Sequence, residues 1–411
     1  METALAPFIK DTPEGREADA ILRACVHCGF CNATCPTYLL LGDELDGPRG
    51  RIYQIKQVLE GAPATAKTQL HLDRCLTCRN CETTCPSGVQ YGRLVDIGRK
   101  VVDERVGRTP TDAARRYALR KGLLSRSLFG AALAAGRFTK ALLPRALATH
   151  VPDAPAAGAW PSARHARRVV IAQGCVQPAL APNIDAATAR VLDRIGISAV
   201  KGAAGCCGAL SFHLDEADEA RTLVRRNIDA WWGEVERGAE AIVVTASGCG
   251  VMVKDYAHLL RDDPAYAVKA ARIASLARDP VEIVHAELAR LVACVSATPA
   301  HRVAFHPPCS LQHGMKIRGA AEAVLRACGY TLTSVPDAHL CCGSAGTYSI
   351  LQPGLAGQLR TNKVAALETG APAEIATANI GCMTHLAAGT PTPVRHWIEL
   401  VDAKLTGDAH A

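Results

Sequence analysis

The sequence has few aromatic residues and no long apolar run. Only 4% of its 411 residues are Phe, Trp or Tyr, which argues against the stacking platforms that single-stranded nucleic acid requires, so we expect no nucleic-acid partner. The best apolar run, residues 129–136, is mostly Ala and Gly and is far shorter than the roughly 20 residues of a membrane-spanning helix. The first twenty residues mix acids, prolines and a lysine without an apolar core, so no secretory signal is expected. We therefore predict a cytoplasmic protein whose cysteines are reduced or bound to metal.

Positive charge is concentrated in one central stretch. The net charge is +7, yet residues 99–168 alone hold fifteen Lys or Arg against four acids. Apolar residues recur at helical spacing among these arginines, which predicts a basic helical linker over residues 101–166. Such a linker is either a helix pair packed between domains or an interfacial helix on anionic lipid. We expect it to attach the protein to a membrane or an acidic partner through Arg115, Arg116, Arg120 and Lys121.

Eight of the eighteen cysteines form two copies of one pattern, Cys-x2-Cys-x2-Cys-x3-Cys-Pro. This spacing is typical of paired 4Fe-4S clusters, because three thiolates share one tight turn and the fourth, next to a proline, reaches the neighbouring cluster. Zinc sites and a disulfide framework are the alternatives, and neither explains the two Cys-Pro steps. Residues 1–100 are thus predicted to form a ferredoxin-type domain that carries electrons. We assign cluster 1 to Cys25, Cys28, Cys31 and Cys85, and cluster 2 to Cys75, Cys78, Cys81 and Cys35.

The second half of the chain repeats itself. Short apolar strands lead to Cys175 and Cys309, Cys-Cys-Gly steps follow at 206–208 and 341–343, and further strands lead to Cys249 and Cys382. The offsets between the copies are 134, 135 and 133 residues, and so constant a period indicates a duplicated domain. Strands alternate with helices in each copy. We therefore predict two homologous small α/β domains with largely parallel pairing, over residues 167–298 and 299–408.

Each copy gathers four cysteines at strand ends, which indicates a second kind of metal site. A thiol at the start of a helix has a lowered pKa, which favours the ligating thiolate. An iron-sulfur centre, a zinc site and metal-free thiols all remain open. Cys294 and Cys328 belong to neither set, and we expect both to be small buried apolar residues. The candidate ligands are Cys175, Cys206, Cys207 and Cys249 in the first copy, and Cys309, Cys341, Cys342 and Cys382 in the second.

These motifs together resemble a known group of proteins. Two ferredoxin-type motifs followed by two Cys...Cys-Cys-Gly...Cys repeats look like the iron-sulfur subunits that serve flavoprotein 2-hydroxyacid dehydrogenases, anaerobic glycerol-3-phosphate dehydrogenase and heterodisulfide reductase. Within that group, the chain closely resembles the iron-sulfur subunits of bacterial glycolate oxidases, in the stretches HLDRCLTCRNCETTCPSGV, NIDAWW, TASGCG and HLCCGSAGTY. The resemblance runs from about Ala18 to Val401, and only the basic linker is nondescript.

The resemblance implies a division of labour. A separate FAD-binding subunit would oxidise glycolate to glyoxylate, and this chain would accept the electrons singly and pass them toward the quinone pool, from the inner face of the cytoplasmic membrane. No GxGxxG opens a helix after a strand, so we expect no FAD on this chain, which would not be catalytic alone. The alternatives are the same role in lactate or glycerol 3-phosphate oxidation, and a thiol-disulfide reductase of the heterodisulfide type.

The repeats depart from the heterodisulfide-reductase pattern at one position. That pattern ends in CxxC, whereas this chain has Met252 and His385 where the fifth cysteine would be. A thioether is a poor substitute for a bridging thiolate, so we expect no disulfide chemistry and at most one metal centre per repeat. His385 could supply a nitrogen ligand, although a lone histidine is more often only hydrogen-bonded. The same default applies to His213, His306 and His313.

Overall fold

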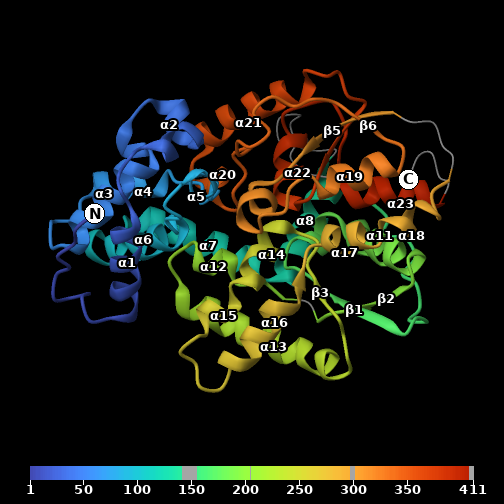
Figure 1. Cartoon of the computed structure of the whole chain (residues 1–411), viewed down its shortest axis with the longest axis horizontal. Helices are drawn as coiled ribbons and strands as arrows, with labels where there is room; N and C mark the ends of the chain where they lie inside the picture. The colour runs from blue at the N-terminus through green and yellow to red at the C-terminus, as the bar shows by residue number, and fades with distance from the viewer. Residues whose placement is uncertain (141–154, 204, 297–300, 407–411) are drawn as a thin grey trace.

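The structure is a computed structural model, and it describes residues 1–140, 155–203, 205–296 and 301–406. Residues 141–154 of the predicted linker, the predicted boundary between 298 and 299, and the predicted end at 408 lie outside the described residues. Figure 1 shows a helical N-terminal domain at one end of the molecule and two α/β units side by side at the other.

The N-terminal domain consists of helices that surround the first two cysteine motifs. Its longest helix, α6, packs against α1, α3 and α4, and Leu22, Ile55 and Leu94 are fully buried between them. α1 begins at Pro13 because the Thr12 hydroxyl accepts a hydrogen bond from the Gly15 N–H. The elements are α1 (Pro13–Ala24), η1 (Phe30–Thr34), α2 (Pro36–Leu41), η2 (Glu44–Asp46), α3 (Pro48–Leu59), α4 (Ala66–Asp73), α5 (Asn80–Thr84) and α6 (Tyr91–Val106).

The two repeats contain one parallel sheet each, with the same strand order, so the predicted duplication and parallel pairing are confirmed. The first sheet runs β2-β1-β3-β4 and the second β6-β5-β7-β8. The strands of the first repeat are β1 (Arg167–Ile171), β2 (Ile197–Lys201), β3 (Ile242–Val243) and β4 (Ala277–Arg278). Those of the second are β5 (Arg302–His306), β6 (Thr331–Leu332), β7 (Glu374–Thr377) and β8 (Val394–His396).

Helices cover both sheets. Those of the first repeat are α10 (Gln177–Leu180), α11 (Pro182–Arg194), α12 (Ala209–Phe212), α13 (Ala217–Glu236), α14 (Ser247–Lys254), α15 (Tyr256–Leu259), α16 (Ala267–Leu276), α17 (Pro280–Ala286) and α18 (Leu288–Val292). Those of the second repeat are the π-helical turn η4 (Ser310–Gly314), α19 (Ala320–Ala327), α20 (Tyr348–Leu351), α21 (Pro353–Glu368), α22 (Ile380–Ala387) and α23 (Trp397–Thr406).

The sheet order explains why each repeat gathers its cysteines. All strands are parallel, but β2 lies on one side of β1 and β3 on the other, so the strand order switches between β1 and β3; in the second sheet it switches between β5 and β7. The carboxyl ends of these neighbouring strands therefore form the crevice in which doubly wound sheets bind ligands. Cys175 and Cys249 follow β1 and β3, and Cys309 and Cys382 follow β5 and β7.

The two repeats pack as one body. Helix α11 of the first lies along α23 of the second, and a single apolar core contains residues of both, with Trp397 fully buried in it. The His396 ring lies 3.1 Å from the Thr245 carbonyl oxygen across this contact.

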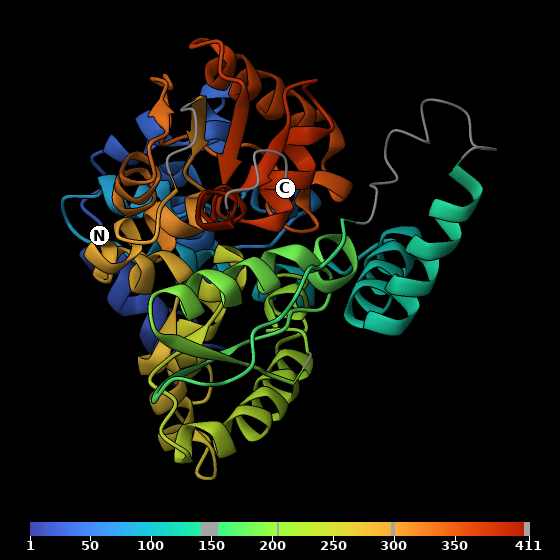
Figure 2. The same cartoon turned by 90° about the vertical axis from the view of Figure 1, so that its right-hand side faces the viewer.

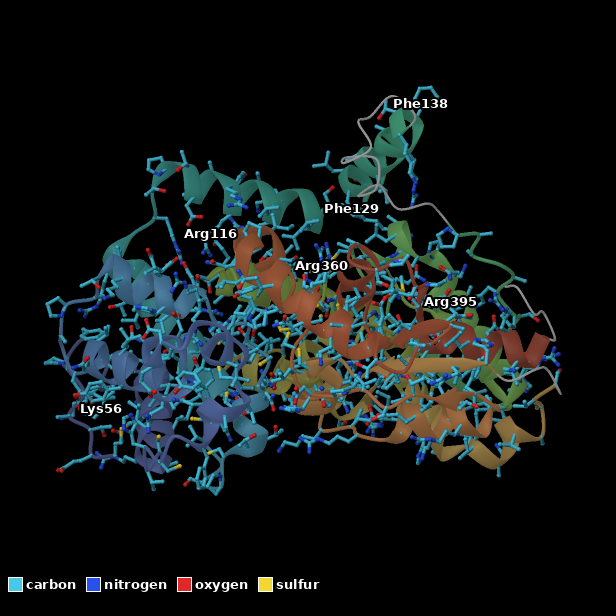
Figure 3. All side chains as sticks on the ribbon, turned by 90° about the horizontal axis from the view of Figure 1, so that it is seen from above. Lys56, Arg116, Phe129, Phe138, Arg360 and Arg395 are labelled. Carbon is cyan, nitrogen blue, oxygen red and sulfur yellow. The ribbon has the colours of Figure 1, made fainter. Side chains whose placement is uncertain are left out.

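Two helices join the N-terminal domain to the repeats. α7 (Pro110–Leu124) lies against the body, whereas α8 (Arg126–Thr139) lies at its edge and touches α7 and α10. Figure 2 shows α8 projecting beside the first repeat, and in Figure 3 Phe129 and Phe138 mark its two ends.

Candidate iron-sulfur sites

Each N-terminal motif winds into a tight turn at the end of a helix, α1 for the first and α4 for the second. Left-handed residues turn successive N–H groups of the loop toward one side, where they can surround an anionic group. Non-glycine residues with such φ angles cost about 1–3 kcal/mol each and persist only where their surroundings fix them. The left-handed residues are His27 and Gly29 (φ 59° and 86°) in the first loop and Thr77 and Arg79 (φ 52° and 58°) in the second.

The structure brings the fourth cysteine of each motif to the other motif. One cavity, with about 430 Å³ of empty space, is lined by Cys25, Cys28, Cys31 and Cys85. A second, with about 300 Å³, is lined by Cys35, Cys75, Cys78 and Cys81. We call them the first and the second cavity. Cys81 borders both, so the two cavities are neighbours.

The residues around these cavities fit 4Fe-4S clusters. Among the described residues that line them there is no Asp or Glu, so the ligands on offer are soft thiolates, which iron-sulfur clusters prefer. The Thr77 N–H and the Tyr91 hydroxyl donate to Cys75 Sγ, at 3.4 and 3.6 Å. Burial raises the pKa of Cys31 to about 11, and the nearby Cys25 adds to the rise. Cationic iron is what would allow four such thiolates to coexist.

Sequence reasoning missed two buried arginines at the second cavity. Arg51 of α3 is 1% exposed and lines the cavity, and Arg99 of α6 is 8% exposed. Arg99 donates to the carbonyl oxygen of Cys75 at 2.6 Å. No sequence signal separates these two from the other basic residues, since only the fold shows that they are buried.

In the first repeat, the four candidate cysteines lie together at the carboxyl edge of the sheet. Their thiols lie close enough to shift one another's pKa, and the Gly208 N–H donates to Cys206 Sγ at 3.4 Å. Interaction with the Cys175 thiol, and then with the Cys207 thiol, lowers the pKa of Cys206, and the same interactions raise the pKa of Cys175 and Cys207. One thiol of the four is therefore prepared to ionise, as a metal ligand must.

The second repeat repeats this arrangement. The Cys309 thiol donates to Cys341 Sγ at 3.8 Å, and the Cys342 thiol interacts with those of Cys341 and Cys382. Burial lowers the pKa of Lys363, which is 3% exposed and donates to the Asp337 carbonyl oxygen at 2.7 Å, and the thiols of Cys341 and Cys342 oppose that shift. A buried ammonium near these thiols stabilises their ionised form.

The Cys-Cys-Gly step needs its glycine in both repeats. Gly208 and Gly343 have φ angles of 96° and 91°, in the left-handed region. A Cβ at Gly343 would meet the Ala356 carbonyl oxygen at 2.7 Å. The turn lets each glycine donate its N–H to the first cysteine of the step, at 3.4 Å in the first repeat and 3.5 Å in the second.

The residues at the missing fifth-cysteine positions have other contacts. Met252 is 5% exposed and packs in the core of the first repeat, in the apolar cluster that also holds Cys207 and Cys249. His385 Nε2 lies 3.3 Å from the Ala356 carbonyl oxygen, so that nitrogen is occupied by the backbone. His306 and His313 are hydrogen-bonded as well. His306 Nδ1 lies 3.0 Å from Thr377 Oγ1, and His313 Nδ1 lies 2.9 Å from Thr83 Oγ1. His213 lies 3.8 Å from an Asp96 carboxylate oxygen.

The four cysteine sites form one continuous row. Cys78 of the second cavity shares an apolar cluster with Cys309 and Cys341 of the second repeat. Asn379 then connects the repeats: its amide donates to Cys382 Sγ at 3.5 Å, and its oxygen accepts the Gly248 N–H at 3.3 Å, beside Cys249. The row begins at Cys28, which is exposed, and continues into the interior.

The linker arginines bind the chain itself, which corrects the expectation that they form the attachment surface. Arg116 pairs with Asp73 at 3.2 Å and Arg120 with Glu219 at 2.6 Å. Lys121 also pairs with Glu219, and Arg115 donates to the Ile350 carbonyl oxygen. These contacts fasten α7 to the N-terminal domain and both repeats, whereas no residue of α8 is buried.

The two remaining cysteines differ from each other. Cys328 is 1% exposed in the core, as expected. Cys294 is only partly buried, and its thiol donates to the Arg194 carbonyl oxygen at 3.6 Å, so the expectation of full burial was wrong there. It lies near the end of the repeat, where α18 gives way to residues outside the described set.

Comparison with known protein families agrees with this anatomy. Residues 21–89 match the 4Fe-4S dicluster domain, and residues 169–254 and 303–387 each match the cysteine-rich domain. The dicluster match identifies two 4Fe-4S clusters as the cofactors of the N-terminal domain.

Individual proteins are similar over most of the chain. The glycolate oxidase iron-sulfur subunit of Escherichia coli is 53% identical over 98% of this chain and 99% of its own length. The probable glycolate oxidase iron-sulfur subunit of Bacillus subtilis is 29% identical over 89% and 88%. Lactate utilization protein A of Bacillus licheniformis is 27% identical over 56% of this chain and 97% of its own length. The chain belongs to the family of glycolate oxidase iron-sulfur subunits.

Proposed function

We propose that this chain is the electron-transfer subunit of a glycolate-oxidising complex, in which a separate FAD-binding subunit converts glycolate to glyoxylate. The observation that carries the proposal is the row of cysteine sites, which begins at the surface with Cys28 and ends in the repeats. The 53% identity to the E. coli glycolate oxidase subunit supports the choice of substrate. When bound, the two clusters supply one-electron carriers.

The surface over the first cavity suits a docking partner. Val26 and Phe30 line that cavity, and they are 68% and 63% exposed. Apolar side chains exposed beside a redox site are typical of a surface that another protein covers. We place the FAD-binding subunit there, within reach of Cys28.

Each repeat is proposed to hold at most one further metal centre, iron-sulfur or zinc. The second repeat is the stronger candidate because Lys363 compensates its thiolates and because Cys309 lies beside Cys78. His385, the nitrogen ligand that the sequence offered in this repeat, does not support the choice, because its Nε2 faces the backbone. The four thiols of each repeat would also hold the strand ends together at the sheet edge.

We place the complex on the inner face of the cytoplasmic membrane, with the quinone pool as its acceptor and α8 as the contact. None of the fourteen residues of α8, all of them described, is buried, and Leu128 and Phe138 are 56% and 90% exposed. The sequence has no acidic residue between positions 113 and 152. An apolar face among basic residues suits the surface of an anionic bilayer. Across the described residues, no helix has the length and apolarity to span a bilayer.

The function is tested by substrate-driven reduction. The purified chain is mixed anaerobically with the co-expressed FAD-binding subunit, and glycolate is added. We expect EPR signals of reduced clusters only when both proteins and glycolate are present. Reduction by lactate or glycerol 3-phosphate, but not by glycolate, would replace the proposed substrate, and reduction by none of the three would contradict the proposal.

A further inference from the structure

Arg99 is a buried cation whose direct partners are all neutral. Its guanidinium donates to the carbonyl oxygens of Cys75 (2.6 Å) and Leu72 (2.8 Å) and to the Thr77 hydroxyl (3.1 Å). No carboxylate among the described residues forms an ion pair with it. Asp73, Asp96 and Asp215 act on it only from beyond ion-pair distance, and Asp73 is already paired with Arg108 and Arg116. A buried charge without a counter-charge in direct contact is unfavourable. Its position on the Cys75 loop therefore calls for an anion in the second cavity.

The first motif has a cation at the equivalent place. The Met1 amino group donates to the carbonyl oxygens of Cys25 (2.6 Å) and Leu22 (3.2 Å). These residues correspond to Cys75 and Leu72, fifty positions later. The same two carbonyl groups thus accept hydrogen bonds in both motifs, and in the second motif the donor is the side chain of Arg99.

Beside Arg99, one more buried cation lies at the second cavity among the described residues, Arg51, which lines it. Arg51 donates to the Asp46 carboxylate at 3.2 Å, and Arg74 donates to the same carboxylate at 2.9 Å, so one anion faces two guanidinium groups. Arg51 also donates to the Thr37 hydroxyl at 3.1 Å, and that oxygen lies 3.3 Å from Cys35 Sγ. The Arg51 guanidinium thus lies two contacts away from a proposed cluster ligand, Cys35, with the Thr37 hydroxyl, which donates to the Asp46 carbonyl oxygen at 2.8 Å, between them.

The first cavity is poorer in buried positive charge. Its arginine, Arg49, has a side chain 36% exposed and paired with Glu44 at 2.6 Å. Water screens an exposed ion pair, whereas buried charges act at nearly full strength. The two cavities thus differ in net positive charge at short range.

We propose that Arg99 and Arg51 are the fixed counter-charges of the second cluster and raise its midpoint potential above that of the first. A cluster held by four thiolates is anionic, and its negative charge grows on reduction, so nearby buried cations favour the reduced form. This inference rests on the proposed function, because it concerns how the two carriers share an electron. With the higher midpoint potential, the second cluster, which lies beside Cys309, would hold the electron when the two clusters share one.

The test is a potentiometric EPR titration of the full-length protein, purified anaerobically with its clusters. In Arg99→Gln and in Arg51→Gln, we expect the midpoint of one cluster signal to shift to lower potential while the other stays unchanged. The signal that is absent in Cys78→Ser identifies the second cluster. Arg99→Lys and Arg51→Lys retain the charge and should return the midpoint toward the wild-type value. Arg105→Gln is the matched control, since Arg105 is exposed on the same helix as Arg99.

Wild-type midpoints in both fully loaded glutamine variants would overturn the proposal. If Arg99→Gln loses the second cluster but Arg99→Lys keeps it, the positive charge is needed for the cluster to assemble. That result supports the counter-charge role although no midpoint potential can be compared. Loss of the cluster in both variants would show that the shape of arginine, and not its charge, is needed, and would contradict the proposal. Failure of the proposed function has a different signature: intact clusters that the FAD-binding subunit and glycolate do not reduce.

Discussion

Cys78→Ser should abolish electron delivery from the FAD-binding subunit and remove one of the two clusters. Serine is a hard oxygen ligand and a poor substitute for thiolate on an iron-sulfur cluster. Cys78 lines the second cavity and touches the second repeat through Cys309, so its loss interrupts the row of sites in the middle. The measurements are iron per chain, the EPR spectrum of the reduced protein, which should lose one of two interacting signals, and glycolate-dependent reduction of a dye.

The control for this variant is Cys328→Ser, which makes the same chemical change at a buried cysteine outside the proposed sites. It should keep both clusters and full electron delivery, at some cost in stability. Cys28→Ser should remove the other cluster, because Cys28 lines the first cavity. Retention of both clusters in Cys28→Ser and in Cys78→Ser would refute the ligand assignment.

Exchanging two apolar residues of α8, in the double variant Leu128→Ser, Phe138→Ser, should release the protein from membranes. Burial of a Leu or Phe side chain is worth about 1.5–3 kcal/mol, and tenfold in affinity corresponds to about 1.4 kcal/mol. We therefore expect vesicle binding to weaken by at least about tenfold. The measurement is flotation with vesicles of phosphatidylcholine and phosphatidylglycerol, against phosphatidylcholine alone, at several salt concentrations.

Val268→Ser is the matched control, because Val268 is 84% exposed on α16, away from the linker. It should bind vesicles as the wild type does. Unchanged flotation of the double variant would show that α8 does not bind the membrane and only connects the domains. Unchanged flotation together with loss of the FAD-binding subunit on purification would instead make α8 a protein-binding helix.

The features that sequence predicted are those encoded within one short stretch or one repeat. The Cys-Pro spacing predicted which thiols lie together, because the loop geometry is set by adjacent residues such as His27 and Gly29. The period of the second half predicted two like sheets, although the strand expected before Cys249 is only two residues long, β3, Ile242–Val243. Its neighbouring residues turn into the loop that starts α14.

The features that sequence could not predict depend on contacts between distant parts of the chain. Cys78 meets Cys309 only because the N-terminal domain docks on the second repeat, where the Asn80 amide donates to the His339 carbonyl oxygen at 3.2 Å. The sequence predicts Arg120 as a surface charge of the linker, but the fold brings Glu219, 99 positions later, within 2.6 Å of it. The burial of Arg51 and Arg99 follows from the same kind of long-range packing.

The central claim is that this chain carries two 4Fe-4S clusters as an electron carrier, and metal analysis tests it most directly. Iron, acid-labile sulfide and zinc are measured per chain on the full-length protein after anaerobic purification. Two clusters predict about eight irons and about eight sulfides per chain. Any further iron, or zinc, would report on the cysteines of the repeats. A protein that is folded and binds its FAD-binding subunit, yet contains zinc without acid-labile sulfide, would contradict the account.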